Sequence, residues 1–523
     1  MALMTPAKAG AFKNEPLLDY KDPQRQKEIR AALDDLRREL GATYPLIVGT
    51  REVRHEKTFS STNPARRSEV IGRHVVAEPA DVDAALDAAT EAFATWSRTS
   101  AEGRAGVLFR TAQLIRERRS RLAALLMLEV GKTWDEADGE VAEAVDLVEW
   151  YGRQMLELDP PRRLTPMENE NTEFFYVPLG VGVVISPWNF PLALTIGMLS
   201  AAIVTGNTAI VKPSSNSPTT VAWLVSLLKE AGLPAGVVSY LTGPGSELGN
   251  RLVDDPRVRF VAFTGSRDVG VEIFERAAKT QPGQRWLKRV QLEMGGKNAV
   301  VVDETADLDR AAEAIVISAF GFQGQKCSAG SRAVIVSSVY DQLVPKIVDR
   351  ARALVVGDPT DPAVSVGPII DEPAWKKVMK YIDIGKSEGR LLTGGSAPSD
   401  GFVAPTIFAD VAPTARIAQE EIFGPVLALI RARDYSEALE IANGTEYGLT
   451  GSIFSQDPAR IREARRSFHV GNLYVNRKTT GAFMGVHPFG GFNMSGTDSK
   501  AGGPDYLLFF LQGKAVGERL RLS

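Results

Sequence analysis

The sequence is poor in the residues that form disulfides or bind metals. Cys327 is the only cysteine among 523 residues, so an internal disulfide and a multi-cysteine metal site are both impossible. The histidines are scattered, without the HxxxH or HExxH spacing of a zinc site; they are His55, His74, His469 and His487. We therefore predict that the histidines are structural and that the protein holds no metal.

Long apolar runs and a strong excess of one charge are also missing. The N-terminal segment MALMTPAKAGAFKNEPLLDY lacks the continuous apolar region of a signal peptide. The most apolar stretches, such as VGVVISPW, are shorter than the ~20 residues that cross a bilayer. The net charge of −3 indicates no basic surface for nucleic acid or anionic lipid. We expect a cytoplasmic protein with neither a membrane nor a nucleic-acid partner.

Strand-like and helix-like segments alternate along most of the chain. A length of 523 residues exceeds the roughly 250–300 residues that one core supports, so at least two domains are expected. TAIVKPS, VVSYLTG and VRFVAFTGS each precede a helical pattern, which is typical of a doubly wound parallel sheet. Such sheets bind ligands at the carboxyl ends of their strands. A second alternation begins at Val290, where VQLEMGGKNAVVV has the pattern of a strand.

Three segments carry residue types suited to nucleophilic catalysis. In FGFQGQKCSAGSR, Cys327 lies beside Lys326, whose charge can favour the reactive thiolate, although a lone cysteine is as often a small buried hydrophobe. In LEMGGKN, Glu293 can take a proton from a thiol or from water, although glutamate before two glycines is more often a turn residue. In VISPWNFPL, the amide of Asn189 can donate to an oxyanion, although an asparagine that satisfies a turn is more frequent.

Together these segments resemble the aldehyde dehydrogenase superfamily. SPWNFP, KPS, FTGS, LEMGGK, GQKCSAGSR, EEIFGP and HPFGGFNMSG occur in family order, and the glutamate and the cysteine are 327 − 293 = 34 residues apart. The resemblance implies that Cys327 attacks the aldehyde carbonyl and that Asn189 and the Cys327 backbone N–H hold the oxyanion. It further implies that Glu293 activates the water that hydrolyses the thioester, with Lys297 in a supporting role behind it.

The resemblance also implies a fold and its division into domains. We expect an α/β protein with a Rossmann-type parallel-sheet cofactor domain, a second α/β catalytic domain and a β oligomerisation flap. The expected ranges are 1–45 for an N-terminal helical arm, 46–160 and 178–290 for the NAD-binding domain, 291–490 for the catalytic domain, and 161–177 and 491–523 for the flap.

The cofactor that the resemblance implies is NAD. GPGSELGN and FTGSRDVG are glycine-containing turns that open helices and can present backbone N–H groups to a pyrophosphate. The run after Lys212 lacks the glutamate that many NAD-selective relatives carry, so we expect NAD to be preferred and NADP to be tolerated. The expected cofactor-binding residues are Ile185, Pro187, Trp188, Lys212, Ser215, Gly245, Gly249, Phe263, Thr264, Gly265, Ser266, Glu421 and Phe423.

The segment Asn476–Leu507 is the most informative about the aldehyde. Its TTGA loop, PFGG box and SGTDSKAGGPDYL ending resemble the branch that oxidises L-glutamate γ-semialdehyde, formed from 1-pyrroline-5-carboxylate, to L-glutamate in proline catabolism. Backbone N–H groups in the TTGA loop can form a nest for the α-carboxylate, and aromatic rings can enclose the methylenes. The expected substrate-binding residues are Phe190, Ser328, Gly481, Ala482 and Phe489, and Glu140 is a candidate for the ammonium unless it lies on a solvated helix face.

Several alternatives stay open. The substrate of such a dehydrogenase can be another semialdehyde. A CoA-acylating relative would transfer the acyl group to CoA, but such relatives usually lack the glutamate at Glu293. A non-catalytic scaffold relative would be expected to lose Cys327, Glu293 or Asn189, and all three are present. We expect a homo-oligomer, a dimer or an assembly of dimers, because a terminal strand with a free edge invites pairing. A proline dehydrogenase is expected only as a separate, transient partner.

Overall fold

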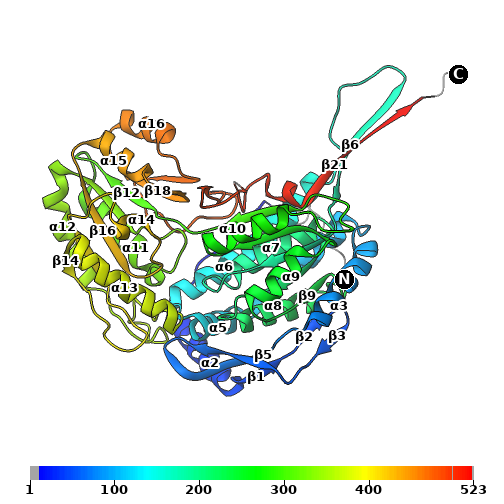
Figure 1. The fold of residues 1–523 in the computed structure, drawn as a ribbon, viewed down its shortest axis with the longest axis horizontal. Helices are drawn as coiled ribbons and strands as arrows, with labels where there is room; N and C mark the ends of the chain where they lie inside the picture. The colour runs from blue at the N-terminus through cyan, green and yellow to red at the C-terminus, as the bar shows by residue number, and fades with distance from the viewer. Residues whose placement is uncertain (1–10, 498, 521–523) are drawn as a thin grey trace.

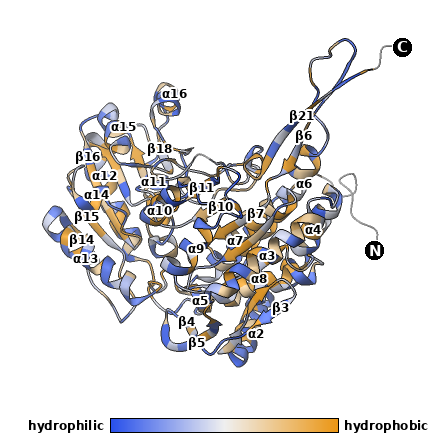
Figure 2. Ribbon diagram, turned by 45° about the vertical axis from the view of Figure 1, so that its right-hand side comes forward, coloured by the Kyte–Doolittle hydropathy of each residue, from blue (hydrophilic) through white to orange (hydrophobic). Residues whose placement is uncertain are grey.

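The computed structural model describes residues 11–497 and 499–520 (Figure 1). Two seven-stranded sheets, each covered by helices, form two lobes that lie side by side, and a two-stranded ribbon projects from one of them. Figure 2 shows the hydrophobic residues concentrated in the central strands and on the helix faces that cover them. No helix in the described ranges combines the length and the apolarity needed to cross a bilayer.

The first sheet has the order β11-β10-β7-β8-β9-β2-β3, and its first five strands run parallel. β7 and β8 are buried along their whole length, as a parallel sheet between two helical layers requires. The strands are β2 (Leu46–Val48), β3 (Arg51–Val53), β7 (Val181–Ile185), β8 (Thr208–Lys212), β9 (Val238–Tyr240), β10 (Val258–Thr264) and β11 (Arg289–Glu293).

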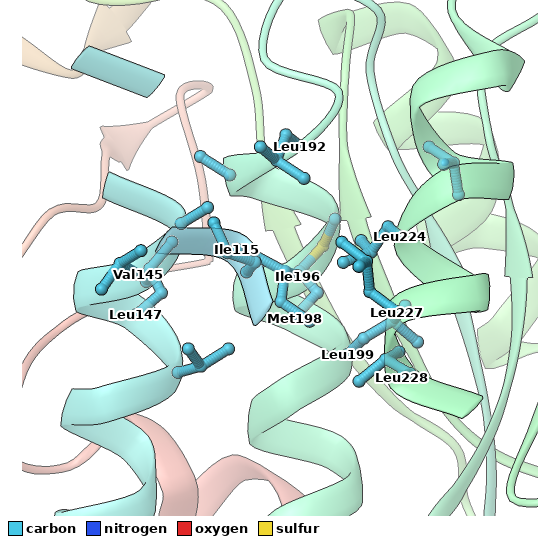
Figure 3. Packing of buried hydrophobic residues seen from close by; sticks show 14 of the residues in the cluster. Ile115, Val145, Leu147, Leu192, Ile196, Met198, Leu199, Leu224, Leu227 and Leu228 are labelled. Atoms are coloured by element: carbon cyan, nitrogen blue, oxygen red, sulfur yellow. The ribbon is translucent and has the colours of Figure 1, made fainter. Parts of the chain in front are cut away.

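Alternate residues of these strands pack on opposite helical layers. Val184 of β7 belongs to the larger core, whereas its neighbours Val183 and Ile185 face the smaller one. Figure 3 shows the larger core where α4, α6, α7 and α8 interdigitate. Its helices are α4 (Ala101–Glu117), α5 (Arg119–Val130), α6 (Trp134–Leu158), α7 (Ala193–Val204) and α8 (Pro218–Glu230). The smaller core contains α3 (Pro79–Trp96), α9 (Asn250–Asp254) and α10 (Arg267–Ala278).

The second sheet has the order β14-β15-β16-β13-β12-β18-β19 and is parallel except at β14. Its strands are β12 (Ala299–Val302), β13 (Arg332–Val336), β14 (Arg390–Thr393), β15 (Thr406–Ala409), β16 (Val426–Ala432), β18 (Thr450–Phe454) and β19 (Asn472–Val475). One face is covered by α11 (Leu308–Phe320) and α12 (Ser337–Arg352). The other is covered by α13 (Glu372–Glu388), α14 (Arg416–Gln419), α15 (Tyr435–Asn443) and α16 (Pro458–Ser467).

The smaller elements complete the two lobes. α2 (Pro23–Glu39) packs against α5, next to a sheet of order β1-β5-β4. The strands of the projecting ribbon pair antiparallel over nine residues each, from Leu511↔Pro178 to Arg519↔Glu170. The remaining strands are β1 (Ala42–Tyr44), β4 (Thr58–Asn63), β5 (Arg66–Val75), β17 (Tyr447–Gly448) and β20 (Phe492–Asn493), and the ribbon consists of β6 (Glu170–Pro178) and β21 (Leu511–Arg519).

The structure corrects two strand assignments made from the sequence. The stretch from Val290, expected to be one strand that opens the second domain, forms β11 in the first sheet and β12 in the second. The glycine pair Gly295–Gly296 lies between the two strands, where the chain crosses from one sheet to the other. Residues 171–186 likewise form two strands, separated at Gly180, whose φ of 141° breaks the extended run. Glu293 therefore lies where the two sheets meet.

Candidate active site

The loop that carries Cys327 is held in an unusual backbone conformation. It follows the 3₁₀ helix η2 (Gly321–Gly324), in which Phe322 and Gln323 have φ of 50° and 57°. Non-glycine residues adopt this left-handed region at a cost of about 1–3 kcal/mol each. The side-chain amide of Gln323 donates to the carbonyls of Gly131 and Pro368, at 3.2 and 3.0 Å, and so holds the loop in place. Such strain is most common at functional sites.

The surroundings of the Cys327 sulfur favour the thiol over the thiolate. Burial, followed by the charges of Glu293 and Glu421, raises the pKa of Cys327 to about 12. We expected Lys326 to favour the thiolate, and that expectation is wrong, because the Lys326 ammonium lies 2.7 Å from a carboxylate oxygen of Glu136. Its charge is therefore already compensated by an ion pair. Nucleophilic chemistry at this sulfur needs a base that removes the thiol proton.

Glu293 ends β11 and is almost fully buried. One of its carboxylate oxygens accepts a hydrogen bond from the backbone N–H of Gly491 at 3.3 Å, and its backbone forms a bridge with Gly496. The HPFGG segment predicted from the sequence therefore packs on the carboxylate. Because the charge of Glu293 is the second-largest cause of the raised Cys327 pKa, the two groups belong to one site.

Asn189 lies in the loop between β7 and α7 and is buried. Its side-chain Nδ2 donates to the backbone carbonyl of Gln325 at 3.0 Å, two residues before Cys327. This bond ties the asparagine to the nucleophile loop and uses one of the two N–H bonds of the amide. Asn189 and Cys327 both line one cavity, which leaves the second N–H available to a ligand there.

This cavity, of about 540 Å³, opens at the carboxyl ends of β7, β8 and β10. That is where an open parallel sheet binds ligands. A larger cavity of about 730 Å³ next to β3 and α8 contains no predicted site residue. The smaller cavity is lined by all but one of the expected cofactor residues: Ile185, Pro187, Trp188, Lys212, Gly245, Gly249, Phe263, Thr264, Gly265, Ser266, Glu421 and Phe423. Ser215 is the exception, and Ser214 takes its place on the wall.

One end of the cavity suits a phosphate group. Ser266 is the N-cap of α10 and makes no side-chain capping bond, so the first backbone N–H groups of this helix remain available next to the part of the cavity wall that Gly265 and Ser266 form. Gly245 begins a π-helical turn, η1 (Gly245–Gly249), which also lines the cavity. Lys212 is buried at the end of β8, and burial lowers the pKa of its ammonium to about 8. Together, the N-terminus of α10, the glycine-containing turn and the buried lysine suit the binding of a dinucleotide.

The other end of the cavity is closed by Glu421 and Phe423. A carboxylate oxygen of Glu421 accepts a hydrogen bond from the backbone N–H of Gly296 at 2.9 Å, and burial raises its pKa. Phe423, with a φ of 61°, meets the ring of Trp188 edge to face, with 5.7 Å between the ring centroids. This end lies nearest to Cys327, since the Glu421 charge also raises the pKa of that thiol.

The five expected substrate residues do not line this cavity. The Ser328 carbonyl accepts a hydrogen bond from the Thr479 hydroxyl at 2.9 Å, which joins the TTGA loop to Cys327. The Arg477 side chain donates a hydrogen bond to the carbonyl oxygen of Gly481 at 2.7 Å, which orients that oxygen toward the arginine. Among the described residues, no acceptor pairs with the backbone N–H of Gly481 or Ala482, so both are free to bind an anion. The Phe489 backbone exchanges two hydrogen bonds with Ala501, and Phe190 contacts Phe322 edge to face.

Most of the chain matches one known protein family. The profile of the aldehyde dehydrogenase family matches residues 51–516. The chain belongs to the aldehyde dehydrogenase family. The superfamily predicted from the ordered motifs is thus confirmed, as is the α/β fold class that it implied.

Two relatives of this family member match nearly the whole chain. The 1-pyrroline-5-carboxylate dehydrogenase of Geobacillus thermodenitrificans is 55% identical over 509 residues, which cover 97% of this chain and 99% of the relative. A crystal structure of 1-pyrroline-5-carboxylate dehydrogenase from Thermus with bound NAD is 48% identical, with a TM-score of 0.96, and covers 98% of this chain and 99% of that one. The branch predicted from Asn476–Leu507 is the branch of both relatives.

A third relative of this aldehyde dehydrogenase is a larger protein. It is proline utilization A (PutA) from Bdellovibrio bacteriovorus, whose structure is 42% identical with a TM-score of 0.96. The match covers 99% of this chain but 54% of that one. In that relative, a fold of this kind is part of a longer polypeptide.

The structure also corrects the expectation that Glu140 either binds the substrate ammonium or lies on a solvated helix face. Glu140 is neither exposed on a solvated helix face nor available to a substrate ammonium, because it is buried and paired with Lys132 at 2.7 Å. Glu143, which lies on the same face of α6, was not predicted from the sequence as a site residue. Burial and the charge of Glu140 raise its pKa to about 7, and its charge also acts on Cys327. The i, i+4, i+7 spacing of Glu136, Glu140 and Glu143 is the signal that indicates a common helix face.

Proposed function

We propose that this chain oxidises L-glutamate γ-semialdehyde to L-glutamate with NAD⁺, and that the reaction is the second step of proline catabolism. The observation that carries the proposal is the 55% identity to a 1-pyrroline-5-carboxylate dehydrogenase over 97% of the chain. The active site supports it, because a nucleophile and an amide donor line a cavity of about 540 Å³, and the charge of a buried carboxylate acts on the nucleophile.

The first chemical step forms a bond between the Cys327 sulfur and the aldehyde carbon. Glu293 takes the thiol proton, which the raised thiol pKa makes necessary. The carbonyl oxygen becomes an oxyanion, which accepts hydrogen bonds from the free N–H of the Asn189 amide and from the Cys327 backbone N–H. The protein supplies these donors in fixed positions, since Asn189 is already bound to the nucleophile loop.

Oxidation and hydrolysis follow at the same sulfur. NAD⁺, when bound, accepts the hydride that leaves the thiohemiacetal carbon, and the substrate remains as a thioester on Cys327. Once Glu293 has released the thiol proton to solvent, it takes a proton from water as the water attacks the thioester carbon. The C–S bond then breaks, the Cys327 sulfur recovers a proton from Glu293, and the product leaves as a carboxylate with release of the second water proton. We assign the cofactor to the cavity between Lys212 and Glu421, with its phosphates at the N-terminus of α10. NADP is expected to be tolerated, because Ser214 rather than an acid follows Pro213 on the wall.

The α-carboxylate, the methylenes and the α-ammonium of the substrate are each assigned to separate groups of the protein. The free N–H groups of Gly481 and Ala482 bind the α-carboxylate, together with the Ser328 hydroxyl, and the rings of Phe190 and Phe489 enclose the methylenes. For the α-ammonium, Glu143 replaces Glu140, because its charge reaches the Cys327 site and Glu140 is already paired. Glu143→Gln is then expected to raise the KM for the semialdehyde without changing that for NAD.

The test of the proposed function is a substrate panel. The purified enzyme is assayed by NADH formation with glutamate semialdehyde, succinate semialdehyde and hexanal, with NAD and NADP for each. We expect glutamate semialdehyde with NAD to have the highest kcat/KM. A higher value for another aldehyde would refute the substrate, a strong preference for NADP would refute the cofactor, and dependence on CoA would indicate the acylating alternative.

The domain division and the assembly complete the proposal. We assign 46–160 and 178–290 to NAD binding, 291–490 to catalysis, and 161–177 with 491–523 to an oligomerisation flap. Support comes from the ribbon of β6 and β21, which projects away from the rest of the molecule (Figure 1). No third strand joins this two-stranded sheet within the described chain, where β6 makes only the isolated bridges Arg162–Phe174 and Met167–Glu170 besides its pairing with β21. A dimer in light scattering that dissociates on removal of residues 511–523 would support this; a wild-type monomer would refute it. A proline dehydrogenase is the proposed transient partner.

A further inference from the structure

One buried ion pair beside the active site has no role in the proposed mechanism. The Lys132 ammonium lies 2.7 Å from a carboxylate oxygen of Glu140, and both side chains are fully buried. Lys132 follows the end of α5, and Glu140 is on α6. Removing two charges from water is costly, and a well-packed apolar pair is often as stable. Stability alone is therefore a poor reason for this pair.

The Lys132 ammonium contacts the two loops that carry the proposed catalytic groups. It lies 3.3 Å from the ring centroid of Phe190, the residue after Asn189. It also lies 4.5 Å from the ring centroid of Phe322, in the strained turn just before Cys327. Desolvated cations bind strongly to aromatic ring faces, so Lys132 holds both rings in orientation.

Glu140 fixes the other end of the Asn189 loop. Its second carboxylate oxygen accepts hydrogen bonds from the backbone N–H groups of Leu192 and Ala193, at 2.8 and 3.1 Å. These groups begin α7, whose own N-cap residue provides no side-chain bond. The negative charge at this helix end is also favourable to the helix dipole. Lys132 therefore holds the asparagine loop at the Phe190 ring, and Glu140 holds it at the start of α7.

We propose that the Lys132–Glu140 pair is a positioning unit that sets the distance between the Asn189 amide and the Cys327 sulfur. The backbone carbonyl of Gly131 adds a third tie, since Gln323 of the strained turn donates to it at 3.2 Å. Oxyanion donors act through preorganised geometry, and small displacements are costly in rate. The inference rests on the proposed function, in which Asn189 and Cys327 are catalytic.

A double variant tests the unit. Lys132→Met with Glu140→Gln removes both charges and retains an oxygen that can accept the Leu192 and Ala193 N–H groups. We expect kcat to fall about 10- to 100-fold with the best aldehyde, since the oxyanion donor loses its fixed position. The dissociation constant of NAD, measured by tryptophan fluorescence, is expected to stay within about twofold, because neither residue lines the cofactor cavity.

A second buried pair on the same two helices is a matched control. Arg119 of α5 and Asp138 of α6 lie 2.6 Å apart and are almost as buried, but they bind the backbone near the N-terminus instead of the catalytic loops. Arg119→Met with Asp138→Asn is expected to lower thermal stability and to leave kcat unchanged. An equal loss of kcat in both double variants, or wild-type kcat in the Lys132 variant, would overturn the proposal.

A third variant keeps the test decisive if the Lys132 double variant does not fold. Phe322→Leu removes one of the two rings and leaves both charges in place. We expect its kcat to fall with little change in the KM for NAD, and an unchanged kcat would overturn the proposal. Failure of the proposed function is distinguishable, because it appears as a lack of glutamate semialdehyde oxidation by the wild-type enzyme. The variants are then compared with whichever aldehyde the wild type oxidises.

Discussion

Replacing Glu293 by glutamine separates the two effects of this carboxylate on Cys327. With a thiol pKa of about 12, the thiolate fraction near pH 8 is about 10⁻⁴, a deficit of ~5 kcal/mol. A base next to the sulfur offsets part of this deficit. The same carboxylate also causes some of it, since its charge is the second-largest contribution to the raised pKa. Glu293→Gln therefore removes the base and at the same time lowers the pKa of the thiol.

The two effects act on different steps. A lower thiol pKa partly compensates the loss of the base during attack on the aldehyde, but nothing replaces the base that activates water. We therefore expect steady-state kcat to fall by about 10²–10⁴, with hydrolysis of the thioester rate-limiting. Stopped-flow absorbance should then show a burst of NADH that approaches one equivalent per active site. Mass spectrometry of the quenched enzyme should show an acyl adduct on Cys327.

Glu421→Gln is the matched control for the electrostatic effect. The Glu421 charge is the next contribution to the raised thiol pKa, but this residue has no role in water activation in the proposed mechanism. At saturating NAD, this variant should show no burst. If Glu293→Gln retained more than about a tenth of wild-type kcat and showed no burst, the assignment of Glu293 as the base would be refuted.

Three further predictions concern the oxyanion, the cofactor and the response to acid. Asn189→Ala should lower kcat by about 10²–10³ in steady-state assays, because one oxyanion donor is lost; a change below fivefold would contradict this. Lys212→Met should raise the KM for NAD about tenfold or more with little effect on kcat, because a charged hydrogen-bond donor on the cavity wall is lost. Burial lowers the pKa of His74 to about 3, so between about pH 6.5 and 3 the unfolded chain binds a proton that the folded chain does not. Stability therefore falls as the pH drops through this range, and His74→Gln should flatten the dependence of Tm on pH in calorimetry.

The local sequence predicted the elements that bind the cofactor. Strands that are apolar throughout, such as β7 and β8, can only be buried between two helical layers, and turns that contain glycine open the next helices. The carboxyl ends of parallel strands necessarily meet at one edge. Twelve of the thirteen cofactor residues that the family resemblance implied line a single cavity, to which the second lobe contributes Glu421 and Phe423. Ser215 is missing from it because this residue lies in the turn after β8 and is exposed, whereas Ser214 before it lines the cavity.

Charges were harder to predict than strands. Lys326 and Glu140 each looked available from the sequence, yet each is neutralised by a residue on another segment, Glu136 and Lys132 respectively. An ion pair between segments depends on how helices pack, and no spacing along one segment indicates it. The separation of β11 from β12 was missed for a related reason, since both halves have the same apolar pattern and only the glycine pair between them marks the crossing.

By itself, the sequence determined which chemical groups are present, their order along the chain, and the alternation of strands and helices, because these follow from residue type and local periodicity. Only the tertiary structure decided which charges remain free and how acidic the Cys327 thiol is. It also decided which loops hold Asn189 against that thiol. Those properties depend on burial and on groups brought together from distant segments, since the energy of a charge or a hydrogen bond is set by its surroundings in space.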